Sequence, residues 1–277
     1  MIPDDSLAGR SPDGTADRLS VFAAPRFSLR FVPLWRRHFL VWRKYLLERV
    51  LSNIVEPLMT LVAFGYGLGA LLPDIGGVQY LPFLATGTIC VSVMYSAKFE
   101  SLWGAYSRME VQKTWAGVMN TPLSVDDILF GELMWAASKS LFTGICMLLI
   151  IWALGIGRTS GSLLVLPVLF FAGLSFSAMA LIVNALARGW DSLSTYFTVV
   201  VTPMVFLSGV FFPLSRLPDW LQVISEWLPL TATVQIVRPM MLSQPMQNAG
   251  RYGLLLAAYT LIGYAVALVL TRRRLLK

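Results

Sequence analysis

Charge is scarce in this sequence. Only 13% of its 277 residues are Asp, Glu, Lys or Arg, whereas soluble domains usually carry about a quarter. Hydrophobic residues make up 56%, and the mean hydropathy is +0.68. Several segments of about twenty residues have almost no ionisable side chain, which is the length that crosses the hydrocarbon layer of a bilayer. These features exclude a typical soluble enzyme and predict an integral membrane protein.

Histidine and cysteine are equally rare, which restricts the chemistry. The one histidine, His38, cannot form a histidine cluster. Cys90 and Cys146 lie in apolar runs without the spacing of metal ligands, so neither a zinc site nor a disulfide framework is expected. The GxxxxGK[ST] phosphate-binding loop is missing, so ATP would have to be bound by a separate subunit. We therefore expect no catalytic, cofactor or metal site on this chain.

Six apolar segments are each long enough to span a bilayer as a helix. They cover residues 50–72, 80–103, 128–154, 162–187, 193–213 and 252–271. Backbone groups in lipid need hydrogen-bond partners within their own segment, so we predict an all-α fold with six transmembrane helices. Pro203 should bend the fifth of them. Residues 1–30 are rich in Asp, Pro, Gly and Ser and are expected to form a disordered tail, which leaves 31–277 as one membrane domain.

Lysine and arginine are distributed unevenly among the predicted loops. With the N-terminus inside, sixteen of the 22 fall on the cytoplasmic side and four, including Arg238, on the outer side. Since positively charged loops resist translocation, both termini are predicted to be cytoplasmic. The net charge of +7 then reflects this bias and contact with anionic membrane lipid, not a nucleic-acid partner.

Residues 31–49, before the first span, are predicted to form an amphipathic helix. Trp35 and Trp42 share one face of it, whereas Arg36 and Arg37 lie on another. Such a helix is expected to lie in the headgroup plane of the inner leaflet. Its role is either a simple anchor or a hinge that links the first span to a cytosolic motor, and the pattern is compatible with both.

The connection between the second and third spans is longer than a tight helical hairpin needs. We predict a short helix there, interrupted at residues 120–122, from which Arg108, Glu110, Lys113 and Trp115 project. Ser124 and Asp127 resemble a capping box that begins the next helix. A short helix at this elbow could transmit movement, whereas an ordinary solvated loop is the simpler alternative.

A second long connection covers residues 213–250 on the predicted outer side. It contains five prolines, yet its leucine and tryptophan residues keep helical spacing. The segment is either a cap at the outer interface, with tryptophan at headgroup level, or a gate that closes an exit path.

Ionisable residues near membrane depth are costly and often functional. Glu100 and Lys139 could form an ion pair between the antiparallel second and third spans. The central parts of the spans carry no charge, which disfavours a proton- or sodium-coupled carrier but leaves a secondary exporter as the alternative. A membrane-embedded enzyme is also disfavoured, because Glu100, Asp126, Asp127 and Glu132 have no histidine base beside them.

Two blocks of sequence and the basic ending RRRLLK resemble a known family. The blocks are FESLWGAYSRMEVQKTWAGVMNTPLSVDDILFGELMWAASKS (99–140) and VTPMVFLSGVFFPLSRLPDWLQVISEWLPLTATVQIVRPMM (201–241). They are similar to the membrane subunits of type-2 ABC exporters and, within these, to the nodulation protein J group. The similarity extends from about residue 31 to the end of the chain.

This resemblance implies a bacterial inner-membrane permease that exports lipochitooligosaccharide, the Nod factor, or a related glycolipid. It implies a homodimer of this chain with two copies of a NodI-like ATP-binding subunit, which would bind ATP and magnesium. The segment 213–240 would form re-entrant outer helices. The coupling helix that docks into the ATPase would contain Arg108, Met109, Glu110, Gln112, Lys113, Thr114 and Trp115.

Overall fold

The structure is a computed structural model that describes residues 29–69, 71, 74, 77–158, 160–246 and 248–275. Within these residues nearly all secondary structure is helical and there is no β-strand, which confirms the all-α prediction. The tail expected at residues 1–30 lies outside the described residues except for its last two positions.

The helices follow one another through short connections. The first half of the chain contains α2 (Phe31–Arg43), α3 (Leu46–Thr60), η1 (Leu61–Tyr66), α4 (Tyr80–Phe99), η2 (Glu100–Gly104), η3 (Ser107–Val111), α5 (Thr114–Met119) and α6 (Val125–Ala153). The second half contains η4 (Ser160–Leu164), α7 (Val165–Leu186), α8 (Trp190–Tyr196), η5 (Phe197–Val201), α9 (Thr202–Leu207), η6 (Leu214–Arg216), α10 (Asp219–Glu226), α11 (Pro229–Leu242) and α12 (Ala249–Leu275). Segments η1, η2, η3 and η5 are π-helical, whereas η4 and η6 are 3₁₀-helical.

Four helical segments of the described chain are long and apolar enough to cross a membrane. They are Tyr80–Val111, Val125–Ala153, Gly161–Leu186 and Ala249–Leu275, and they correspond to the second, third, fourth and sixth predicted spans. The other two predicted spans are also helical but are not among these four segments, so a total of six transmembrane helices stays a prediction.

Each of these two spans contains a proline, which cannot donate a backbone hydrogen bond within a helix. Pro57 lies inside α3, within the short apolar stretch Val55–Tyr66. Pro203 lies at the start of α9, directly after the π-helical turn η5. The predicted fifth span therefore comprises α8, η5 and α9, with the π-helical turn beside the proline where a bend is expected.

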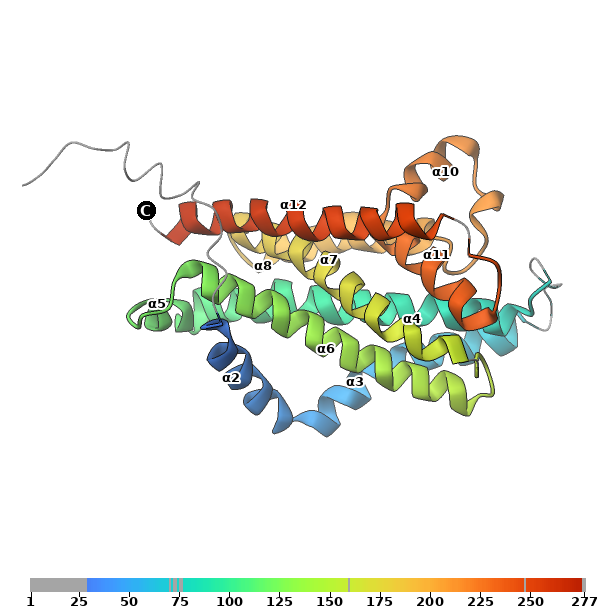
Figure 1. Cartoon of the computed structure of the whole chain (residues 1–277), viewed down its shortest axis with the longest axis horizontal. Helices are drawn as coiled ribbons and strands as arrows, with labels where there is room; N and C mark the ends of the chain where they lie inside the picture. Colours follow the sequence, from blue (N-terminus) through green and yellow to red (C-terminus); the bar gives the residue numbers. More distant parts are fainter. Residues whose placement is uncertain are drawn as a thin grey trace, which may run out of the picture.

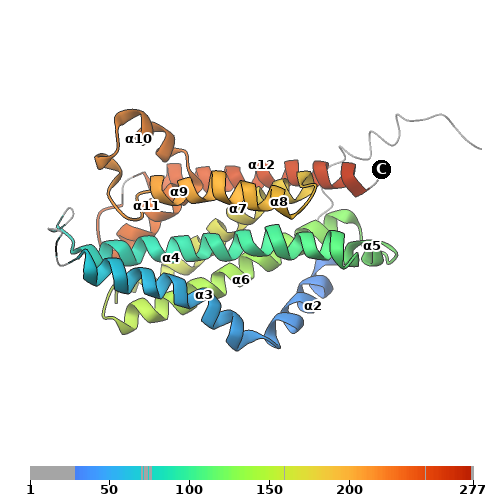
Figure 2. The same ribbon diagram turned by 180° about the vertical axis from the view of Figure 1, so that it is seen from behind.

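The long helices α4, α6, α7 and α12 run along the longest axis of the molecule (Figure 1). Helix α7 is central, because it packs against α4, α6, α11 and α12. The elbow helix α5 and the C-terminal end of α12 lie at one end of the bundle, which we call the basic end because Arg272, Arg273 and Arg274 are there (Figures 1 and 2). Helix α10 lies at the opposite end.

Helix α2 is shorter than the predicted 31–49 helix. It ends at Arg43, and the turn at 44–45 redirects the chain into α3, so that α2 and α3 form a V on one side of the bundle (Figure 2). Its buried face consists of Leu34, His38 and Trp42. Because α2 packs against α6, it is part of the folded bundle and also presents a face to the surroundings.

The connection expected on the outer side contains one buried helix. Helix α11 packs against α4, α7 and α12, whereas α10 is mostly exposed. Arg238 was assigned to an outer loop from the charge count, but it lies on α11, with its guanidinium 3.7 Å from the centre of the Phe83 ring. It also donates to the Gly209 carbonyl at 2.8 Å, so this arginine fastens α11 to the turn after α9.

Candidate functional site

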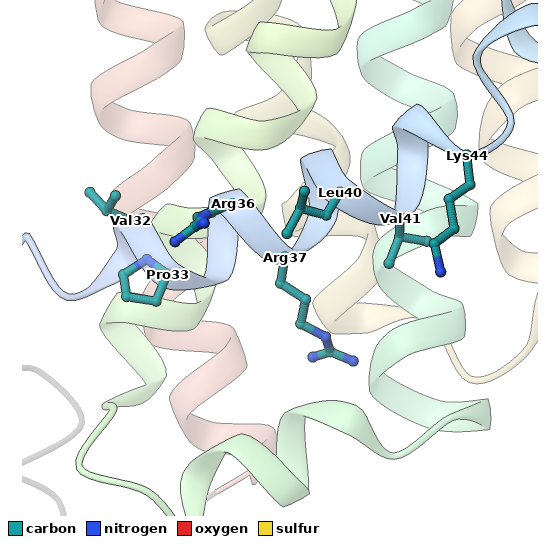
Figure 3. A pocket seen from close by; sticks show the side chains of 7 residues that line it. All are labelled: Val32, Pro33, Arg36, Arg37, Leu40, Val41 and Lys44. Atoms are coloured by element: carbon teal, nitrogen blue, oxygen red, sulfur yellow. The ribbon is translucent and has the colours of Figure 1, made fainter.

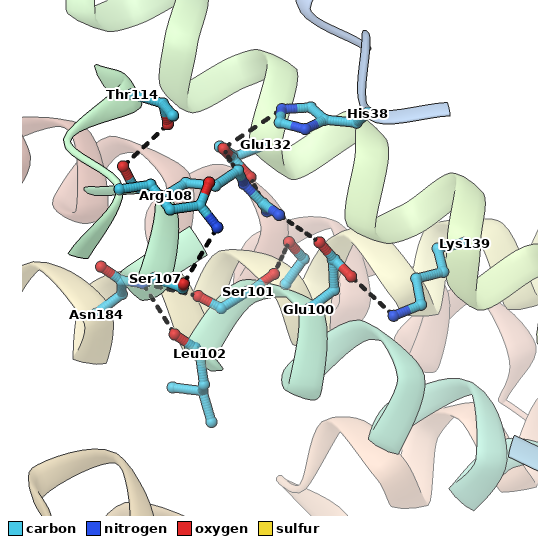
Figure 4. A network of polar contacts seen from close by, with 12 residues as sticks. His38, Glu100, Ser101, Leu102, Ser107, Arg108, Thr114, Glu132, Lys139 and Asn184 are labelled. Carbon is cyan, nitrogen blue, oxygen red and sulfur yellow. Dashed lines mark hydrogen bonds and ion pairs between the residues drawn. The ribbon is translucent and has the colours of Figure 1, made fainter. Parts of the chain in front are cut away.

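Glu132 is a shared hydrogen-bond acceptor for two parts of the chain at the basic end, and a third part lies beside it. This α6 side chain is 2% exposed. Its carboxylate accepts hydrogen bonds from both Arg108 Nε, at 2.9 Å, and Arg108 Nη2, and a third from Trp115 Nε1 at 3.1 Å (Figure 4). His38 Nε2 of α2 lies 3.5 Å from Glu132 Oε1. One carboxylate therefore joins α6 to the end of the 80–111 helix and to α5, and it borders α2.

Glu100 continues the network toward the middle of the bundle. Its carboxylate contacts Lys139 Nζ at 2.7 Å and Arg108 Nη1 at 2.9 Å. The expected partner of Glu100 is thus beside it, and Arg108 lies between two carboxylates (Figure 4). Buried charges are tolerated only when they are paired, because their desolvation costs several kcal/mol per ion. The alternation of Lys139, Glu100, Arg108 and Glu132 meets this condition.

Gly104 makes room for the ion pair between Glu100 and Arg108. It lies between them on the π-helical continuation of α4, where a Cβ would be 2.7 Å from Glu100 Oε1 and 3.3 Å from Arg108 Nη1. A Cβ at this position would displace the Glu100 carboxylate. The glycine therefore leaves space for the ion pair in its present geometry.

His38 is beside the carboxylates, so the prediction that no histidine accompanies them is wrong. Burial lowers the pKa of His38 below its ordinary value of 6.5, although the Glu132 carboxylate acts in the opposite direction. The imidazole is therefore neutral at neutral pH. Both oxygens of Glu132 already accept hydrogen bonds from Arg108, so the arrangement is suited to joining helices and not to activating a nucleophile.

A second set of ion pairs attaches the end of α12 to the same region. Arg272 forms two parallel hydrogen bonds with Asp126 in the first turn of α6, and both side chains are 6% exposed. Arg274 donates to the Asn184 carbonyl at 3.0 Å and to Glu110 Oε1 at 2.9 Å. From the sequence alone, these arginines indicate only the orientation of the chain in the membrane. The acidic start of α6 was the signal that could have suggested their partners.

The predicted coupling residues do not project together from one short helix, so that expectation is wrong. The 80–111 helix carries Arg108, Met109 and Glu110, whereas α5 begins only at Thr114. Between them Lys113 adopts a left-handed conformation with φ of 52°, which is uncommon for a side chain with a Cβ and ends the first helix. Thr114 Oγ1 donates to the Arg108 carbonyl across this break.

Burial divides these seven residues into two groups. Arg108, Met109 and Trp115 are turned inward, with Trp115 only 3% exposed. Glu110 and Thr114 are half-buried, whereas Gln112 and Lys113 are exposed. The inward group connects the elbow to the bundle, and only the remaining residues can meet a partner.

The exposed elbow face is the surface that a partner could contact. It consists of Gln112, Lys113, Ala116, Gly117 and Asn120. A Cβ added at Gly117 would have no neighbour within 4 Å, so this part of the surface is open. The last three residues were not among the predicted coupling residues, because small and uncharged side chains give little functional signal. In the described parts of the chain no group of three His, Cys, Asp or Glu could hold a metal ion.

Known proteins resemble the chain over most of its length. Residues 30–242 match the family described as ABC-2 type transporter. The chain is 38% identical to nodulation protein J of Sinorhizobium fredii over 246 residues, which cover 89% of this chain and 94% of the relative. It is also 38% identical to nodulation protein J of Bradyrhizobium diazoefficiens over 253 residues, or 91% of this chain and 97% of the relative. The inner membrane transport permease YadH of Escherichia coli is 25% identical over 183 residues, or 65% of this chain and 71% of the relative.

These similarities include both the elbow and the helices that the buried network joins. Apolar helices long enough to cross a membrane are what an integral inner-membrane protein requires. Membership of this family also implies an ATP-binding partner subunit. The chain therefore belongs to the ABC-2 type transporter family, as the membrane subunit of an ABC transporter.

Proposed function

We propose that this chain is the permease of an ATP-driven exporter that carries a lipochitooligosaccharide, or a related glycolipid, across the inner membrane. The support for this substrate is the similarity to nodulation protein J, which extends over 94% and 97% of two relatives. The basic end is then cytoplasmic, because its arginines and the elbow lysine follow the positive-inside rule. Both termini lie on that side.

The proposed assembly is a homodimer of this chain with two NodI-like ATP-binding subunits, which bind ATP and magnesium. Each ATPase docks on the exposed elbow face. The elbow is suited to this contact because it presents open backbone at Gly117 and a cation at Lys113, whose side chain is 66% exposed.

The observation that carries the mechanism is that Glu132 of α6 accepts hydrogen bonds from both the 80–111 helix and α5. When the ATPase displaces α5, Trp115 transmits the displacement to Glu132 through the hydrogen bond that its indole N–H donates. Glu132 holds Arg108 at the end of the 80–111 helix. Separating these buried charges would cost several kcal/mol, so the elbow, α6 and the 80–111 helix move together. The movement then opens a path for substrate at the dimer interface.

Docking is tested with a large side chain on the exposed elbow face. Gly117→Arg should prevent copurification of the ATPase from mild-detergent membranes without affecting folding, because the position is open. The matched control is Gly250→Arg at the opposite end, where an added Cβ also meets nothing within 4 Å. If the ATPase copurifies equally with both variants, the elbow is not the docking surface.

Coupling is tested separately with Trp115→Phe, which keeps the buried ring but removes the N–H that donates to Glu132. The ATPase should remain bound, whereas uptake of labelled lipochitooligosaccharide into inside-out vesicles should fall. Uptake at the full rate would contradict transmission through Glu132.

The vesicle assay also tests the class of transporter and its substrate. Uptake that persists without ATP and stops with an uncoupler would show a secondary exporter and overturn the proposal. An ATPase that copurifies but does not respond to lipochitooligosaccharide would reject the substrate alone.

A further inference from the structure

The face of α2 that points away from the bundle contains a groove of about 470 Å³. Its lining includes the basic side chains of Arg36, Arg37 and Lys44 and the apolar side chains of Pro33, Leu40 and Val41 (Figure 3). The opposite face of α2 is the one buried in the bundle. The groove is therefore formed by the part of the helix that packing leaves uncovered.

Among the described residues, the cations of this groove have no acidic partner. Arg36, Arg37 and Lys44 take part in none of the ion pairs found in the described parts of the chain. Figure 3 shows Arg37 and Lys44 extending from the same edge of α2. Three positive charges within about three helical turns, without a carboxylate among them, create a potential that favours an anion.

Apolar surface lies directly beside these charges. Leu40 is 42% exposed and Val41 is 50% exposed, although both are large hydrophobic residues. A soluble anion such as free phosphate would leave this surface in contact with water. A ligand that carries a phosphate and hydrocarbon chains satisfies both parts of the groove, as amphipathic helices do when they lie at the boundary between headgroups and acyl chains.

We propose that the α2 groove binds one anionic phospholipid from the leaflet that borders the basic end. Arg36, Arg37 and Lys44 hold its phosphate, and the first carbons of its chains lie against Leu40 and Val41. The buried face of the same helix carries His38, beside Glu132. A lipid in the groove therefore fixes the position of α2 relative to the buried ionic network, so the lipid composition of the membrane sets how well α2 follows the elbow.

The test measures lipid retention by the purified full chain. The protein in neutral mild detergent is titrated with phosphatidylglycerol or phosphatidylcholine, and bound lipid is counted by native mass spectrometry. Wild type should retain one phosphatidylglycerol in preference to phosphatidylcholine. Replacing Arg36 and Arg37 with Gln should weaken this binding about fivefold for each arginine removed. The variant with Lys at both positions should keep most of the affinity.

Arg43→Gln is the matched control, because Arg43 is exposed on the same helix but does not line the groove. The proposal is overturned if Arg43→Gln weakens phosphatidylglycerol binding as much as Arg37→Gln does, because binding would then respond to net charge alone. Equal retention of the two lipids would also overturn it. Glycerol 3-phosphate should not displace the lipid, and displacement would show an anion site without a lipid requirement. Displacement by the purified ATPase subunit would assign the groove to that protein instead.

Discussion

Replacing Arg272 with Met should destabilise the protein by about 3 kcal/mol, because it leaves the buried carboxylate of Asp126 without its cation. Loss of one member of a buried ion pair typically costs 3–5 kcal/mol. The lower value applies here, since Asp126 lies in the first turn of α6, where the helix dipole stabilises a carboxylate by about 0.3–1 kcal/mol. The converse variant, Asp126→Leu, should cost about 4 kcal/mol, because the same dipole opposes the remaining arginine.

The double variant distinguishes loss of an ion pair from loss of packing. With Leu at 126 and Met at 272, both charges of this ion pair are removed from a site where the two side chains are 6% exposed. Its stability should return to within about 1 kcal/mol of wild type, as found when buried ion pairs are replaced by hydrophobic residues of similar volume. The interaction energy from the double-mutant cycle is then about 6 kcal/mol.

The measurement is equilibrium unfolding in mixed micelles of a mild detergent and dodecyl sulfate, followed by the fluorescence of the nine tryptophans. If the free energy of unfolding of Arg272→Met lies within about 1 kcal/mol of the wild-type value, the ion pair is open to solvent and the prediction is wrong. The prediction is also wrong if the double variant is destabilised by the sum of the two single effects, about 7 kcal/mol.

Three further changes test other parts of the basic end by the same unfolding measurement. Ser124→Ala should cost about 1 kcal/mol, because it removes the N-cap of α6, whereas Ser124→Asn should retain most of the stability. Gly104→Ala should cost about 1–3 kcal/mol, since its Cβ would displace Glu100, and no loss would show that the pair has room to shift. His38 should make stability depend on pH. Its lowered pKa means that the unfolded chain binds the proton more readily, so stability is complete above the ordinary value of 6.5 and falls as the pH is lowered through and below it. His38→Gln should reduce the pH dependence of the free energy of unfolding between about pH 5 and pH 8. If the dependence is unchanged, it arises from other groups.

Several features of the fold could be predicted from the sequence. The capping box was predicted from Ser124 and Asp127 and is confirmed, with Ser124 Oγ accepting from the Asp127 N–H at 3.2 Å. The apolar runs predicted the long helices because the hydrocarbon layer requires them. The proximity of Glu100 to Lys139 also followed from topology, since antiparallel neighbours bring the same depth of each helix together.

The buried network could not be predicted from the residues alone. Arg108 was placed on a solvent-facing elbow because a basic residue near a span end is usually exposed. In the structure the span continues for eight residues beyond the expected end at 103, through two π-helical segments. Each π turn contains more residues than an α turn and therefore alters which side chains face inward. Sequence periodicity does not reveal such turns, nor that α2 would bring His38 to the far side of Glu132.

The attachment of α12 has a consequence for the order of biosynthesis. Asp126 and Glu110 are synthesised early, but their partners Arg272 and Arg274 emerge from the ribosome after every other described helix. Until α12 inserts, Asp126 and Glu110 lack the two arginines that bind them in the folded protein, although Glu110 also contacts Lys113 at 3.0 Å. The elbow is then attached to α6 through Glu132 but not to α12. A nascent or truncated chain is thus distinguishable from a finished one at the surface where a partner would dock.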